Sequence, residues 1–187
     1  MNEKISLRRA TADDARFIAE NVLRALHIEE TQEEHIEHLA GISRREDTLY
    51  SWRNSTIALY DGVPAGVMVA YDGARYRRMR DITFPMIRIY VGDDYHKMDD
   101  EAAPGEYYLD SLAVLPEFRR KGIASALIRE MFRQRDQAGI PLATIAVDPD
   151  NDTAYRLYTR SGFSLDGKIT VFGTTYDRLV AHSRITL

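Results

Sequence analysis

A run of basic residues beside a single glycine is the first stretch of the sequence that could do chemistry. Residues 119–127 read RRKGIASAL, so Arg119, Arg120 and Lys121 precede Gly122 and a small, apolar helix start. A strand that passes through a tight loop into a helix N-terminus presents unpaired backbone N–H groups, which bind anions. Gly122 would let a phosphate approach the backbone, and Ala124 would keep the first turn thin. The pattern predicts a pyrophosphate cradle; a solvated basic turn is the alternative.

Other ligand motifs do not match. No Gly-Lys-Ser/Thr follows at the spacing of a Walker loop, and two of the three Rossmann glycines are missing, which disfavours nucleotide hydrolysis. The stretch DPDND at 148–152 would need glycine and glutamate where Thr153 and Thr159 stand to be a calcium loop, so a turn with a helix cap is expected. His35 and His38 lie one helical turn apart without an evident third ligand, and we expect no metal site.

Strands and helices alternate around the basic loop. The sequence predicts a strand over 106–115, a turn over 116–121, a helix over 122–139 closed by Gly139, and a strand over 142–147. A capped helix over 151–163 follows, and then two β-rich runs separated by Gly173.

In the first half of the chain, the sequence predicts a strand over 5–10, a helix over 11–26 capped by Thr11, and a helix over 31–45. That second helix would have Thr31 as its cap and Glu34 completing a capping box. A hairpin over 55–73 would turn at Asp61 and Gly62. Residues 75–105 are not assigned. They begin with four clustered arginines at 75, 77, 78 and 80, followed by an apolar FPMIRIYV run and an acidic MDDEAAPG run, and they could wall a substrate cleft or be solvated surface.

Composition limits the class of protein. A chain of 187 residues is long enough for one sizeable core, so a single domain over 1–187 is expected. The net charge of -4 argues against nucleic acid as a partner. The absence of cysteine excludes disulfides and a cysteine nucleophile. MNEKISLRRA has no apolar signal core, and no stretch approaches the roughly 18 apolar residues of a membrane helix, so we expect a cytoplasmic protein without a membrane partner.

Two phrases together resemble the GNAT family of acetyl-CoA-dependent N-acetyltransferases. They are YYLDSLAVLPEFRRKGIASALI, with Arg119, Gly122 and Ala124, and NDTAYRLYTRSGF, which begins at Asn151. The resemblance is clearest over 106–163, and the N-terminal half matches in element order only. Ala124 replaces the commoner glycine, and Arg119 stands where glutamine or arginine is usual.

The resemblance implies an α/β fold with a mixed, mostly antiparallel central sheet, splayed around acetyl-CoA and flanked by helices. The strand backbone at Leu112 and Val114 would bind pantetheine. Asn151 would touch the pantetheine arm, although it is equally suited to be a helix cap. The pyrophosphate would bind the loop amides and cations, which belong to Arg119, Arg120, Lys121, Gly122, Ile123, Ala124 and Ser125.

The chemistry that the resemblance implies requires an amine to lose a proton, and a lysine-type ammonium has a pKa of about 10.4. Asp110 and Glu106 lie four apart on one strand, so both face the same side and either could be the base. We prefer Asp110, although each could equally be a strand carboxylate paired with an arginine. Tyr158 stands where the family has a tyrosine that protonates the departing thiolate, with Tyr155 as a neighbouring alternative. Backbone N–H near Val114 would stabilise the oxyanion.

The favoured function is therefore acetyl transfer from acetyl-CoA to an amine of a small molecule, peptide or protein. The rival is a non-catalytic acyl-CoA-binding or regulatory domain of the same fold. A longer acyl donor and an oxygen acceptor would use the same site. A homodimer is an open alternative, because the C-terminal strand TYDRLVAHSRITL could pair with a second subunit or with its own sheet.

Overall fold

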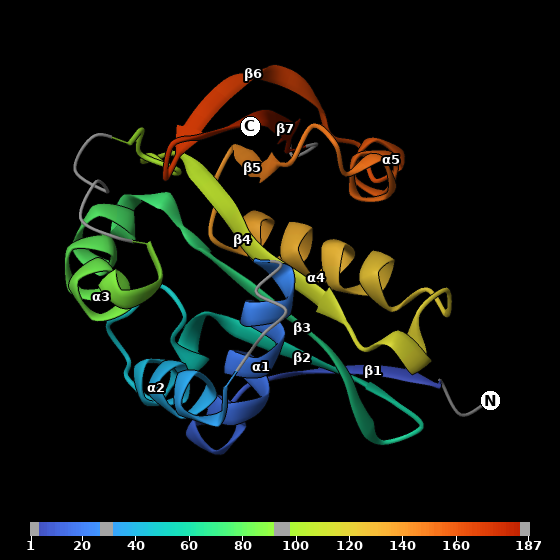
Figure 1. The fold of residues 1–187 in the computed structure, drawn as a ribbon. Coiled ribbons are helices and arrows are strands. Elements are labelled where there is room, and N and C mark those ends of the chain that lie inside the picture. Colours follow the sequence, from blue (N-terminus) through green and yellow to red (C-terminus); the bar gives the residue numbers. More distant parts are fainter. Residues whose placement is uncertain (1–3, 27–31, 92–97, 184–187) are drawn as a thin grey trace. The chain divides into compact units, whose positions relative to one another are not determined.

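Seven strands form one sheet in the computed structural model, which describes residues 4–26, 32–91 and 98–183 (Figure 1). The strand order is β1-β2-β3-β4-β5-β7-β6. The strands are β1 (Ile5–Arg9), β2 (Ser55–Tyr60), β3 (Val63–Asp72), β4 (Glu106–Val114), β5 (Leu142–Val147), β6 (Ser164–Val171) and β7 (Thr174–His182). The β4–β5 pair is parallel, whereas the β1–β2, β2–β3, β5–β7 and β6–β7 pairs are antiparallel. The predicted mixed, mostly antiparallel α/β sheet is confirmed.

In the described part of the chain, five α-helices accompany the sheet: α1 (Ala15–Ala25), α2 (Glu33–Ser43), α3 (Tyr76–Val91), α4 (Ile123–Gln137) and α5 (Asp152–Arg160). The contacts divide the chain into two compact units. The N-terminal unit comprises Met1–Ala70 and Ser111–Leu127, and the C-terminal unit comprises Tyr71–Asp110 and Ile128–Leu187. The strands β3 and β4 and the helix α4 contribute residues to both units. The single domain expected from the length of the chain stays a prediction.

In the N-terminal unit, the predicted hairpin is present as β2 and β3. Asp61 has φ of 48° and Gly62 has φ of 83°, the pair of left-handed residues that a tight two-residue hairpin needs. The helices α1 and α2 pack beside each other (Figure 1). Their apolar faces are buried, with Ile18, Val22 and Ala40 fully inaccessible to solvent.

The predicted start of α2 is wrong. Gln32, in an extended conformation, is the N-cap, and Glu33 is the first helical residue, so Glu34 does not complete a capping box with Thr31, which lies outside the described residues. The beginning of α2 is paired with α1. The Arg16 guanidinium of α1 binds the carboxylate of Glu33 at 2.5 Å and that of Glu37 at 2.7 Å.

In the C-terminal unit, the unassigned segment after β3 forms the helix α3, although Pro85 lies inside it. Proline costs a helix interior about 3 kcal/mol. Burial of one face offsets this cost, because Tyr76, Met79, Phe84 and Ile87 are each at most 3% exposed. Tertiary packing therefore overrides the local helix breaker.

The helix predicted over 11–26 is α1, which begins at Ala15; Thr11 caps the 3₁₀ turn Ala12–Asp14 that precedes it. The other boundaries differ little from those predicted. The helix α4 begins one residue later and ends two residues earlier than the sequence suggests, and Gly139 follows it with φ of 67°. The helix α5 ends at Arg160 rather than at 163, because Gly162 adopts φ of 105° in the turn after it. The strand β7 pairs with β5 on one side and β6 on the other, which is the pairing with its own sheet that the sequence left open.

Candidate functional site

The basic loop joins β4 to α4 in the N-terminal unit. After a 3₁₀ turn at Pro116–Phe118, Arg120 has φ of 60° and Gly122 has φ of 86°. The Gly122 carbonyl accepts the first helical bond from the Ala126 N–H at 3.0 Å, so the amides of residues 123–125 precede that bond. Successive amides at a turn with left-handed residues form a concavity that binds anions.

The loop has room for a phosphate. Gly122 is exposed, and a β-carbon built on it would meet Ile5 Cδ1 at 3.9 Å, so the approach to the backbone is open. The Lys121 ammonium lies 5.2 Å from the centre of the Tyr60 ring. Arg119 Nε donates to the carbonyl of Val114 at 3.3 Å, which fastens the loop to the end of β4. A pyrophosphate therefore fits the residues present here.

The pairing of β4 with β5 involves the first residues of β4. Its register with β5 covers Glu106 to Tyr108, opposite Leu142 to Thr144, although β4 continues to Val114 and β5 to Val147. Leu112 and Val114, the predicted pantetheine contacts, are half-buried on the part of β4 beyond that register.

The helix α5 carries Asn151, Tyr155 and Tyr158. The Asn151 side chain accepts the Ala154 N–H at 3.0 Å, so it is the helix cap that the sequence predicts. Tyr155 is half-buried, whereas Tyr158 is 6% exposed and packs edge-on against Phe163 with ring centres 5.8 Å apart. Burial raises the pKa of the Tyr158 phenol, which keeps it protonated. The stretch at 148–152 is a turn, with Asp148 Oδ1 accepting the Asp150 N–H at 2.9 Å.

The two carboxylates predicted on β4 lie in the C-terminal unit and have different partners. Tyr71 Oη donates to Asp110 Oδ2 at 2.8 Å. Glu106 binds Arg178 of β7 at 2.5 Å and also accepts the Ala103 N–H at 3.2 Å. The arginine-paired alternative that the sequence analysis held for both residues thus describes the surroundings of Glu106, while Asp110 is held by a neutral phenol.

Sequence reasoning missed a third carboxylate, Glu101, as an individual candidate. Tyr108 Oη donates to Glu101 Oε2 at 2.8 Å, and Tyr76 Oη donates to Oε1 at 3.4 Å. Burial, followed by the charge of Asp110, raises the pKa of Glu101 to about 7. The acidic run MDDEAAPG before β4 was a visible signal. The local sequence does not show that Glu101, and not a neighbouring aspartate, binds the buried tyrosines.

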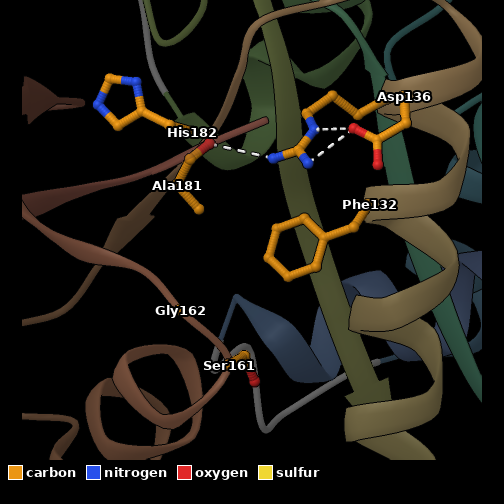
Figure 2. Close-up of a pocket in the computed structure, with 7 residues that line it drawn as sticks. Phe132, Asp136, Ser161, Gly162, Ala181 and His182 are labelled. Atoms are coloured by element: carbon orange, nitrogen blue, oxygen red, sulfur yellow. Dashed lines mark hydrogen bonds and ion pairs between the residues drawn. The ribbon is translucent and has the colours of Figure 1, made fainter. Parts of the chain in front are cut away.

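A cavity of about 260 Å³ lies elsewhere in the C-terminal unit. Figure 2 shows Phe132 and Asp136 of α4 on one side of it, Ser161 and Gly162 after α5 on another, and Ala181 and His182 of β7. The buried Arg135 also lines it, and its guanidinium is held by Asp136 at 2.7 Å and by the Ala181 carbonyl at 3.1 Å. None of the residues predicted for the site lines this cavity.

Two further searches concern metals and membranes. Within residues 4–26, 32–91 and 98–183, no three His, Cys, Asp or Glu side chains group in a way that could hold a metal ion. In the same residues, no helix has the length and apolar character needed to cross a bilayer.

Comparison with known proteins defines the class. A solved acetyltransferase structure shares 24% identity, with a TM-score of 0.74 and coverage of 96% of this chain and 100% of that chain. An N-acetyltransferase from Staphylococcus aureus Mu50 shares 19% identity, with a TM-score of 0.78 and coverage of 94% and 100%. AAC(6')-Ib in complex with parmomycin and acetyl-CoA shares 19% identity, with a TM-score of 0.67 and coverage of 96% and 94%. These likenesses show the acetyltransferase fold.

The family follows from the sequence itself. The model of the acetyltransferase (GNAT) family matches residues 19–163, which is most of the chain. The chain belongs to the acetyltransferase (GNAT) family, as the two phrases around Gly122 and Asn151 predict. Membership of this family supports acetyltransferase activity in general terms.

Proposed function

We propose that this protein is an N-acetyltransferase that moves the acetyl group of acetyl-CoA to an amine by direct attack in a ternary complex. The observation that carries the proposal is the loop at Gly122. Its left-handed backbone, open approach and exposed cations suit a pyrophosphate, and the loop stands in a chain of the acetyltransferase family.

The loop amides and the cations of residues 119–121 would hold the pyrophosphate of acetyl-CoA, with Ile123, Ala124 and Ser125 as backbone donors. The backbone of β4 at Leu112 and Val114 would bind the pantetheine arm in the manner of an added strand. Support comes from the early end of the β4–β5 register, after Tyr108. Asn151 and Tyr155 would contact the arm, with the Asn151 side chain also capping α5.

Asp110 would take the proton from the incoming ammonium, either directly or through a water. The hydrogen bond from Tyr71 supports this role, because it orients the carboxylate without neutralising it, whereas Arg178 neutralises Glu106. The neutral amine would then attack the thioester carbonyl. A backbone N–H near Val114 would stabilise the oxyanion that forms.

Tyr158 would give its proton to the departing CoA thiolate. A phenol whose pKa is raised by burial stays protonated and can donate, which supports this assignment. Such a reaction belongs in a compartment supplied with acetyl-CoA, and we propose the cytoplasm.

The direct test is release of free CoA from acetyl-CoA in the presence of an amine panel. The panel contains an aminoglycoside, a polyamine, a lysine peptide with a blocked N-terminus and a peptide with a free N-terminus. Acceptor-dependent CoA release supports the proposal and identifies the acceptor class. Saturable acetyl-CoA binding without release for any amine would favour the non-catalytic acyl-CoA-binding alternative.

A further inference from the structure

Three successive acidic residues before β4 are each bound to a different part of the C-terminal unit. Asp99 Oδ2 accepts the Thr170 N–H of β6 at 2.8 Å, and the Asp99 N–H donates to the Thr170 carbonyl at 3.0 Å. Asp100 binds Arg77 at 2.6 Å and Arg80 at 2.5 Å, both on α3. The acidic run is therefore not simply solvated, and two of the four arginines that the sequence singled out hold it in place.

These two anchors, at Asp99 and Asp100, hold the chain directly before Glu101. The next residues are held as well, because Ala103 lies against Gly73 and its carbonyl accepts the Glu106 N–H at 3.1 Å. Glu101 thus occupies a rigid position among tyrosines. Tyr108, which binds it, also packs against Tyr71 with ring centres 5.9 Å apart, and Tyr71 in turn binds Asp110.

Glu101 and Asp110 are linked in this way through a network of three buried tyrosines, Tyr71, Tyr76 and Tyr108, each at most 2% exposed. We call the five residues the tyrosine–carboxylate network. Resting on the proposed function, we propose that Glu101 is a second catalytic carboxylate, which shares with Asp110 the proton taken from the acceptor amine.

The charges around Glu101 support a shared proton. Burial and the charge of Asp110 raise the pKa of Glu101 to about 7, so near neutral pH it exchanges a proton rather than staying ionised. The groups that interact with it are Tyr71 of β3, Tyr76 of α3, Tyr108 and Asp110 of β4, and Tyr176 of β7. The Arg80 guanidinium lies 5.8 Å from the centre of the Tyr76 ring, and Arg80 is bound by Asp100 and Asp81.

The proposed acetyl transfer moves two protons and exchanges one carbon–sulfur bond for one carbon–nitrogen bond. The acceptor ammonium gives one proton to the carboxylates of Glu101 and Asp110, and its lone pair forms the bond to the acetyl carbon. The carbon–sulfur bond then breaks. The second amine proton reaches the CoA thiolate through Tyr158, and the carboxylates release the first proton to water. The products are the acetamide and CoA thiol, with one proton released to solvent.

The proposed role belongs to Glu101 and not to Glu106, although both carboxylates lie in the C-terminal unit. Glu106 is neutralised by Arg178 at 2.5 Å, and that arginine also binds Asp166. Glu101 has phenols as its hydrogen-bond partners, and burial and the charge of Asp110 raise its pKa to about 7 although the phenols act in the opposite direction.

The experiment compares wild type, Glu101→Gln and the matched control Glu130→Gln. Glu130 has a side chain 15% exposed and binds Arg133 and Gln134 on α4, away from the tyrosine–carboxylate network. We expect Glu101→Gln to lower kcat at least about tenfold and to move the acidic limb of the kcat/KM profile from near pH 7 by at least about one unit. Acetyl-CoA binding should stay as in wild type, and Glu130→Gln should match wild type throughout. Glu101→Asp should restore part of kcat.

A second measurement needs no folded variant. In wild-type protein with labelled glutamate carboxyls, we expect one resonance to titrate near pH 7. Its absence, or a Glu101→Gln protein with wild-type kcat and pH profile, would overturn the role of Glu101 while leaving acetyl transfer established. A wild-type protein that releases no CoA with any amine would instead overturn the proposed function, and this role with it.

Discussion

The hydroxyl of Tyr71, a residue 2% exposed on β3, donates a hydrogen bond of 2.8 Å to the carboxylate of Asp110 on β4. The bond fixes one oxygen of the carboxylate that we propose as the amine's proton acceptor. Burial and the charge of Asp110 both raise the pKa of the Tyr71 phenol, so it remains a donor across the working pH range.

Asp110→Asn should lower kcat by about 10²- to 10⁴-fold, because the amide cannot accept a proton. Tyr71→Phe should have a smaller effect, about tenfold, because the carboxylate remains but loses its orienting donor. Acetyl-CoA affinity should be unchanged in both. Steady-state CoA release and calorimetry measure the two quantities.

The control for Tyr71→Phe is Tyr107→Phe. Tyr107 also lies on β4, and its hydroxyl donates to Gln134 at 2.8 Å, so the same atom and one hydrogen bond are removed away from Asp110. Turnover by Tyr107→Phe should match wild type. Equal losses in the two variants would indicate a general effect on β4 and contradict the specific role of Tyr71.

The buried phenol of Tyr158 leads to a second prediction. Tyr158→Phe should reduce kcat by about 10- to 100-fold without weakening acetyl-CoA binding, because the thiolate loses its proton donor. Tyr155→Phe should affect kcat less, since Tyr155 is half-buried and is assigned to cofactor contact. A larger loss of kcat in Tyr155→Phe would transfer the role to Tyr155.

Gly73 provides a test of the segment that carries Glu101. A β-carbon at Gly73 would lie 2.2 Å from the backbone oxygen of Ala103, so Gly73→Ala must displace that backbone. We expect a loss of about 1–3 kcal/mol in the free energy of unfolding, measured with urea. Gly167→Ala is the control, because a β-carbon there meets nothing within 4 Å and should change stability less. Equal stability of the two variants would contradict the close packing at Gly73.

The raised pKa of Glu101 also leads us to expect that the free energy of unfolding depends on pH. Its pKa is raised to about 7 in the folded protein, while the unfolded carboxyl titrates near 4.5, so the folded state binds more protons between these values. Wild-type stability should therefore fall as pH rises from 5 to 8, by on the order of 2–3 kcal/mol from this group. Glu101→Gln cannot ionise and should lose less over the same interval. Urea unfolding at both pH values checks this; parallel losses would show that Glu101 is not shifted.

Much of the fold could be predicted because its signals are local. The hairpin at Asp61 and Gly62 and the strand Leu142–Val147 follow from turn residues and apolar runs within a few positions. The helix α3 could not be predicted, because Pro85 argues against it and the burial that outweighs Pro85 comes from distant residues. The cap of α2 was predicted one residue too early, at Thr31 rather than at Gln32.

The candidate site, too, could be predicted where its signals are local in the sequence and not where distant residues decide. The cradle at Gly122 could be read from glycine, charge and the following helix, but the left-handed backbone of Arg120 has no signature in its residue type. Asp110 and Glu106 were indistinguishable in sequence, because the partners that separate them, Tyr71 and Arg178, lie on other strands. Glu101 was hidden within an acidic run for the same reason.

The central claim is that the loop at Gly122 binds acetyl-CoA, and calorimetric titration tests it most directly. Wild-type protein should bind acetyl-CoA saturably, with free CoA and ATP as comparison ligands. Gly122→Glu should abolish binding, because it places bulk and negative charge in the cradle and strains a backbone with φ of 86°. Circular dichroism and urea unfolding of the variant check that it is folded. No binding to wild type, or unchanged binding to folded Gly122→Glu, would contradict the account.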